Sequence, residues 1–212
     1  MNKISFIFLV LLALWSCSDD DEVTASNDSE ENTLLTFEQA KARYETLRTT
    51  NAGLTRTAGF PTTGTRVYKG IHGGRFFDGN STSETRVEYY AQVEFNLDFE
   101  TGEFTGKLTN FRTDLEGFET PEGELNVSGV IRDTQEMGGD EYGLRFRVQD
   151  GELTQGERTA IFDGRTESKG RFSGNTGQFA NIRITSTFSW TAGPDTGTVS
   201  GTIGFMLSER EE

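Results

Sequence analysis

Cysteine and histidine carry much of the nucleophilic and metal chemistry of proteins, and this 212-residue chain holds one of each, Cys17 and His72. A catalytic triad would therefore have to use His72, and zinc sites built from clusters of cysteine and histidine are excluded. Carboxylate chemistry needs two acids facing each other across a groove, and none of the 34 aspartates and glutamates is marked out as such a pair. We therefore expect a protein that is not an enzyme and that holds no metal and no cofactor.

Cys17 ends a stretch with the features of a bacterial export signal. Lys3 makes the start of the chain positive, and the apolar run from Ile4 to Leu14 is too short for a permanent membrane helix. Leu14-Trp15-Ser16-Cys17 resembles a lipobox, at which bacteria cleave before the cysteine and attach acyl chains to it. We interpret residues 1–16 as the signal peptide and Cys17 as a lipidated N-terminus held at a membrane by palmitate-type chains. The alternative is an ordinary secretory signal cut near Ser16-Cys17.

The segment after Cys17 is strongly acidic. Residues 18–32 contain no aromatic side chain, which predicts a disordered tether within a lipidated region at 17–35. Its start, Ser18 to Glu22, resembles the surface-export signal of a group of bacterial outer-membrane lipoproteins, so we expect the protein to face the cell exterior; the alternative is a plain spacer. Cleavage would remove Lys3 and change the formal net charge from −14 to −15. Such acidity argues against nucleic-acid partners and leaves the acyl chains as the only membrane attachment.

Residues 36–63 are predicted to form a helix and a linker. Thr36 and Gln39 have the spacing of a capping box, in which each side chain accepts from the backbone amide of the other residue. Arg48 is expected in the last turn, where the helix dipole favours a cation, and Gly53 ends the helix. We expect the helix either to plug one end of the following domain or to pack on its side. Its apolar stripe consists of Phe37, Ala40, Tyr44 and Leu47.

From Thr65 onward, apolar and polar residues alternate as in strands with one buried face. In the clearest stretch, 92–99, the side chains expected inside are those of Val93, Phe95, Leu97 and Phe99. About eight such strands follow one another with short polar connections, which is typical of antiparallel neighbours. We predict an all-β domain at 64–207, folded as a single eight-stranded antiparallel up-and-down β-barrel rather than a sandwich, because closure leaves no edge strands. Residues 208–212 are predicted to be an acidic tail.

A short repeat supports closure of the sheet. Segments 102–106, 170–174 and 197–201 each contain glycine, any residue, a bulky apolar residue, Thr or Ser, and glycine. Segment 126–129 is a partial copy. Glycine weakens a strand unless the strand bends sharply or another backbone comes close, and both occur at barrel corners.

The same region resembles a known family. Phe60 to Gly70, in which a Pro-x-x-Gly turn leads into an aromatic-x-Gly strand, is similar to the first strand of the C-terminal barrel of transferrin-binding-protein-B-like surface lipoproteins. Val93 to Gly106, Lys169 to Gly174 and Gly197 to Gly204 match its later strands. The resemblance covers roughly residues 60–207 and implies a barrel on the outer membrane that binds a host or environmental ligand, a protein or an iron- or haem-related compound, through its loops. This chain has room for one barrel only, so transferrin binding itself is not implied.

The expected contact residues lie in connections between strands. Residues 71–80 are predicted to join the first two strands, and this stretch combines glycines with arginine and aromatic residues, which dominate interface hot spots. Its candidate contact residues are His72, Arg75, Phe76 and Phe77. Alternatively, Phe76 or Phe77 turns inward as a plug. Arg112 opens a second long connection, 112–122, and a third spans 133–141.

Two binding modes are open to such a barrel. Loops carry the specificity if side chains fill the interior. A lipocalin-like carrier instead holds a small apolar ligand inside, which requires an open interior with a few polar groups. The many inward phenylalanines favour the filled version, so we expect a protein or small-molecule ligand to bind through the loops. We also expect the protein to be a monomer.

Lipidation of Cys17 can be tested by metabolic labelling. In cells supplied with a clickable palmitate analogue, the wild-type protein should be labelled, and the Cys17→Ser variant should stay unlabelled because acylation requires the thiol. Immunoblotting controls for the amount of each protein. Equal labelling of the two would refute the assignment.

Overall fold

The computed structural model describes residues 34–57, 59–78, 87–114, 119–132, 143–162, 167–194, 196–197 and 199–211. In this part of the chain the elements are α1 (Phe37–Ala52), β1 (Thr65–Asp78), β2 (Val87–Asp98), β3 (Glu103–Thr113), β4 (Glu122–Arg132), β5 (Gly143–Gln155), β6 (Arg158–Phe162), β7 (Glu167–Ser173), β8 (Phe179–Ala192) and β9 (Val199–Arg210). β9 therefore extends past the predicted end of the barrel at residue 207. No helix among these residues has the length and apolar character needed to cross a membrane.

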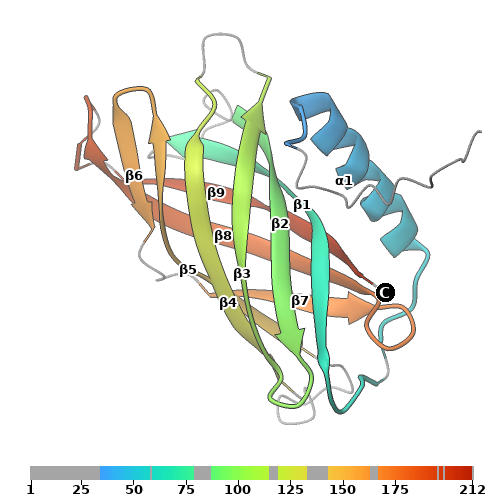
Figure 1. Ribbon diagram of the computed structural model, residues 1–212. Coiled ribbons are helices and arrows are strands. Elements are labelled where there is room, and N and C mark those ends of the chain that lie inside the picture. Colours follow the sequence, from blue (N-terminus) through green and yellow to red (C-terminus); the bar gives the residue numbers. More distant parts are fainter. Residues whose placement is uncertain are drawn as a thin grey trace, which may run out of the picture. The chain divides into compact units, whose positions relative to one another are not determined.

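The strands form one antiparallel sheet that closes on itself. β1 to β5 pair in chain order, and β9 pairs with β8 on one side and β1 on the other. β6 and β7 together fill the place between β5 and β8, because β6 pairs with Gly151–Gln155 of β5 and β7 with Gly143–Arg147. The nine strands thus occupy eight positions, which confirms the predicted closed eight-stranded barrel. Figure 1 shows β2, β3 and β4 in front and β8 and β9 behind them.

Alternation along the strands places apolar side chains inside the barrel. Val93, Phe95 and Leu97 are at most 3% exposed, and Phe99, just after β2, is 8% exposed. Between them, Glu94 and Asn96 face solvent. The predicted register of this strand is confirmed.

Glycines make room for the large inward side chains of neighbouring strands. Phe95 on β2 lies opposite Gly106 on β3, and a Cβ atom at Gly106 would be only 2.4 Å from the Cβ of Phe95. Phe104 lies opposite Gly129 in the same way, and a Cβ there would be 2.3 Å from its Cζ. The close approach predicted from the glycine repeat is therefore present at these two positions.

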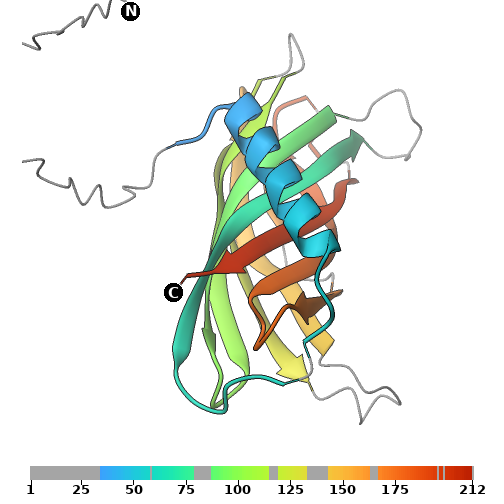
Figure 2. The same ribbon diagram turned by 90° about the vertical axis from the view of Figure 1, so that its right-hand side faces the viewer.

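The helix begins at the predicted cap and packs on the side of the barrel. The Thr36 amide donates to Gln39 Oε1 at 2.9 Å, and the Gln39 amide donates to Thr36 Oγ1 at 3.3 Å. Its apolar stripe covers the outward residues Ile71, Tyr90, Phe179 and Leu207. Figure 2 shows α1 lying across the outside of the wall that contains β1, β2 and β9. Arg48 lies before the last turn, where it pairs with Glu45 at 2.7 Å.

The chain on either side of α1 is tied to the barrel. Before the helix, Arg112 Nε and Asn110 Nδ2, both on β3, donate to the Leu35 carbonyl at 3.1 and 3.3 Å. After it, the ring of Phe60 packs edge-on against Phe172 at 4.8 Å between centroids. The linker thereby adds an aromatic ring to the end of the barrel core.

The register makes a prediction about stability. Phe95 is fully buried and stacks on Tyr68 at 4.9 Å, so Phe95→Ala should lower the free energy of unfolding by about 3–5 kcal/mol. The matched control is Glu94→Ala at the adjacent outward position, which should change it little. Urea unfolding followed by circular dichroism measures both. Similar midpoints for the two variants would contradict the register.

Candidate ligand-binding surface

Most of the predicted first loop is strand. β1 continues to Asp78, so the expectation of a connection at 71–80 was wrong for residues 71–78. Glycine suggested a loop, but here it allows close packing: a Cβ at Gly73 would lie 2.9 Å from ring atoms of Tyr44 on α1 and of Tyr90 on β2. The stretch therefore belongs to the barrel wall under the helix.

His72 and Phe76 point into the barrel and do not form an external contact patch. They are 1% and 9% exposed, and Phe76 stacks on Tyr89 at 4.1 Å between centroids. For Phe76, the inward alternative is the correct one. His72 Nε2 lies 2.5 Å from the Tyr89 hydroxyl, which is also hydrogen-bonded to the hydroxyl of Thr202. His72 Nε2 and the hydroxyls of Tyr89 and Thr202 thus form a short hydrogen-bonded row inside the wall.

Burial keeps this polar group uncharged. It lowers the pKa of His72 to about 3 and raises that of Tyr89 well above its ordinary value. A neutral, buried imidazole is not placed to meet an external ligand. Among the described residues, no group of three or more His, Cys, Asp or Glu side chains is arranged to hold a metal ion.

Of the other predicted contact residues, only Arg75 is seen at the surface. It projects from the outer wall of β1, opposite Glu88 on β2. Arg112 is half-buried in β3, rather than in a loop, and holds the Leu35 carbonyl. The side chain of Phe77 and most of the connections at 79–86, 115–118 and 133–142 lie outside the described residues.

Two aromatic clusters occupy the interior of the barrel. One is built around the stack of Tyr68 on Phe95 and includes Phe104, Phe146 and Phe172. The other surrounds Tyr89 and Phe188 and includes Phe76, Phe111, Phe162 and Trp190. Each of these rings is less than one-tenth exposed. An interior occupied in this way favours binding on the outside over a lipocalin-like carrier.

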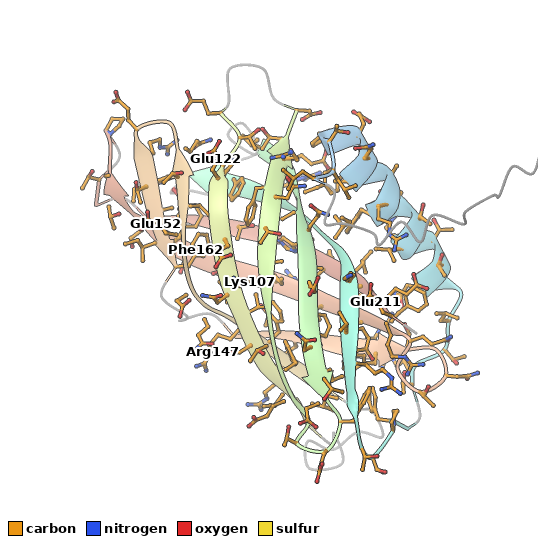
Figure 3. The ribbon with its side chains drawn as sticks, in the orientation of Figure 1. Lys107, Glu122, Arg147, Glu152, Phe162 and Glu211 are labelled. Carbon is orange, nitrogen blue, oxygen red and sulfur yellow. The ribbon has the colours of Figure 1, made fainter. Side chains whose placement is uncertain are left out.

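The outer wall of β2, β3 and β4 carries charges that are balanced locally. Lys107 on β3 lies opposite Glu94 on β2, and its Nζ is 2.8 Å from a carboxylate oxygen of Glu124 on β4. Lys107, and Arg147 on the adjoining strand β5, project from the wall in Figure 3. This polarity suits a wall surrounded by water, since a lipid-facing barrel has an apolar outer band.

A different pattern covers the outer wall of β5, β7 and β8. Arg145 on β5 lies opposite Lys169 on β7, which lies opposite Arg183 on β8. Arg171 is the next outward residue of β7. We call Arg145, Lys169, Arg171 and Arg183 the basic strip. Phe205 on β9 continues the row opposite Arg183, and 46% of its surface is exposed.

Three of the four residues of the basic strip have no acidic partner in the part of the chain that the structure describes. Across the described part of the chain, no carboxylate forms an ion pair with Lys169, Arg171 or Arg183. The nearest acidic position on β9, Glu209, faces Arg43 of α1 at 3.9 Å. The amino-acid sequence alone does not reveal the strip. Alternation in the sequence marks its residues as outward, but only the strand register aligns them.

Comparison with known proteins finds a likeness to a solved structure. No family model and no curated protein matches the chain. A solved structure described as the crystal structure of a surface lipoprotein is similar over 74% of this chain, with 14% sequence identity and a TM-score of 0.38. The similarity covers 65% of that structure's own length.

The buried imidazole makes stability depend on pH. The unfolded chain takes up a proton at His72 near pH 6.5 and the folded chain only near pH 3, so acidification through this interval favours unfolding, and the effect vanishes above it. His72→Gln keeps a polar group beside Tyr89 but cannot titrate. Between pH 6.5 and about pH 4.5 the variant should lose about 2 kcal/mol less unfolding free energy than the wild type. Parallel urea-unfolding curves at the two pH values measure this, and equal losses would contradict a neutral buried His72.

Proposed function

We propose that this protein is a lipid-anchored binding protein displayed on the bacterial outer membrane, and that it holds its ligand on the outside of the barrel. The observation that carries the proposal is the polarity of the barrel wall. Aromatic rings occupy the described interior, whereas charged side chains such as Lys107, Glu124 and Arg183 stand on the outer face. Recognition then falls to the exterior and the connecting segments.

The anchor is the part of the proposal that rests on the sequence. Cys17 follows an apolar run and a small residue, and acidic residues follow it directly. Each buried methylene of an acyl chain contributes about 0.8 kcal/mol, so several chains on one cysteine hold a protein stably at a membrane. We propose that the acidic segment directs the anchored barrel to the outer surface.

We further propose that the chain is a small single-barrel relative of the transferrin-binding-protein-B-like lipoproteins. The segments that resemble this family fall on barrel strands in the expected order. Residues 93–106 form the hairpin of β2 and β3, with Gly102 at the turn in a left-handed conformation (φ 71°), and residues 65–70 open β1. These placements support the resemblance, and the ligand is a separate question.

Binding is favoured over catalysis for this barrel. The chain has one histidine, which is buried and neutral, and its one cysteine is assigned to the anchor. Nucleophilic chemistry of the kinds considered above would need one of these two groups accessible to a substrate. We propose that the protein acts by capturing a ligand.

Surface display can be tested on intact cells. A C-terminally tagged wild-type protein should be degraded by proteinase K added to whole cells, because the barrel faces outward, while a periplasmic marker protein survives. The Cys17→Ser variant should escape degradation, because it lacks the anchor. Protection of the wild type until the cells are lysed would contradict surface display.

A further inference from the structure

We propose that the basic strip, together with Phe205, binds an anionic linear polysaccharide, meaning a chain of sugar rings that carry carboxylate or sulfate groups. This inference rests on the proposed role as a surface binding protein, and it assigns the ligand class and the site. Lys169, Arg171 and Arg183 are exposed, and Arg145 lies half-buried beside Lys169. The strip spans neighbouring strands β5, β7 and β8, and Phe205 extends it to β9.

The first step is the charge pattern. Like charges directly opposite each other on neighbouring strands destabilise a sheet, and the strip has two such contacts, Arg145 with Lys169 and Lys169 with Arg183. On the other wall, Glu124 also lies opposite a like charge, Glu152, but there Lys107 binds Glu124. A chain with 34 acidic and 20 basic residues has carboxylates in excess to balance cations. Three exposed cations without ion pairs in the described structure therefore form a site that an external anion can balance.

The acidic residues that the structure describes near the strip form no ion pair with Lys169, Arg171 or Arg183. On β7, Glu167 is paired with Arg147 of β5, which lies outside the strip. Glu209 is engaged with Arg43. Arg75 on β1 lies opposite Glu88 and is therefore not included in the site.

The second step is geometric. Neighbouring strands lie about 4.8 Å apart, so Arg145, Lys169, Arg183 and Phe205 form a row with that period across four strands. The advance of one sugar ring along an extended polysaccharide is similar. Successive rings can thus bring their acidic groups to successive cations, and the guanidinium groups offer paired N–H donors that match a carboxylate or sulfate.

Phe205 supplies an apolar contact surface beside the cations. A phenylalanine that is 46% exposed on a polar wall offers an apolar ring face next to Arg183. The C–H face of a sugar ring can stack on such a ring while its acidic group reaches the neighbouring cation. The outward hydroxyl of Thr185 and the amide of Asn181 on β8 flank the row and can bind sugar hydroxyls.

Charge density separates this ligand from nucleic acid. Duplex DNA carries one negative charge per about 1.7 Å, whereas an acidic polysaccharide carries roughly one per ring or fewer. A protein with a formal net charge of −14 repels the denser polyanion more strongly. At physiological ionic strength, interactions between exposed charges are screened beyond about 8 Å. The cations of the strip therefore outweigh the more distant acidic residues for a ligand of low charge density that lies on the wall.

The test uses the full-length protein in a neutral detergent and measures binding by biolayer interferometry. The probes are polygalacturonate, hyaluronate and chondroitin sulfate, with neutral dextran, single-stranded DNA and polyphosphate for comparison. We compare the wild type with Lys169→Gln/Arg183→Gln and with Phe205→Thr. The matched control is Arg66→Gln/Lys107→Gln, which removes the same charge from exposed positions outside the strip.

We expect at least one anionic polysaccharide to bind the wild type, with dextran inactive and affinity falling as salt rises. Lys169→Gln/Arg183→Gln should weaken this binding about tenfold or more, and Phe205→Thr should also weaken it, while the control stays close to the wild type. Because the strip variant loses a like-charge contact, its thermal midpoint should be unchanged or higher. Loss of binding without loss of stability distinguishes a binding site from a structural one.

Several results would overturn the inference. These are no binding to any anionic polysaccharide, binding that the strip variant retains, equal weakening by the control, and strip-dependent binding of DNA or polyphosphate only. None of them affects surface display, which the protease experiment measures separately. Failure of the ligand assignment and failure of the proposed function can therefore be told apart.

Discussion

The barrel depends on matching large inward side chains with glycines on the adjacent strand. Phe95 faces Gly106, Phe104 faces Gly129, and Tyr89 faces Gly74. At Gly106 and Gly129 the facing strand comes so close that an added Cβ atom would lie within 2.4 Å of an atom of the facing phenylalanine. Alternating large and small residues lets the rings overlap across the interior. The packing of the phenylalanine and tyrosine core and the closure of the sheet therefore depend on the same glycine positions.

This constraint is the reason that we propose a binding function for the outside of the barrel. Because aromatic rings occupy the inward positions, the charged side chains lie at the outward positions. On β2, β3 and β4 that charge is balanced by contacts such as Lys107 with Glu124. On β7 and β8 it is left as a row of cations, and the fold tolerates them because the aromatic core supplies its stability elsewhere.

The sequence predicts the features that depend on local pattern. Strict alternation at 92–99 assigned each side chain to the correct face, and the spacing of Thr36 and Gln39 marked the first turn of α1. The first loop was mispredicted because glycine has two uses, and Gly73 gives space to Tyr44 from the distant helix. The basic strip was missed for a related reason. Its members come from three separate strands, and only the register of pairing places them in one row.

The attachment of the N-terminal segment to the barrel has a mechanical consequence. Arg112 and Asn110 grip the Leu35 carbonyl from β3, a strand paired on both sides. A pulling force on the chain before Leu34 acts first on these hydrogen bonds. It acts next on the packing of α1 against the barrel wall, and last on the hydrogen bonds between strands. Because β3 is paired with both β2 and β4, the force is shared as shear between these three strands. It does not separate a strand from the edge of a sheet. Under the anchoring that we propose at Cys17, drag on the barrel would thus be carried by the middle of its sheet.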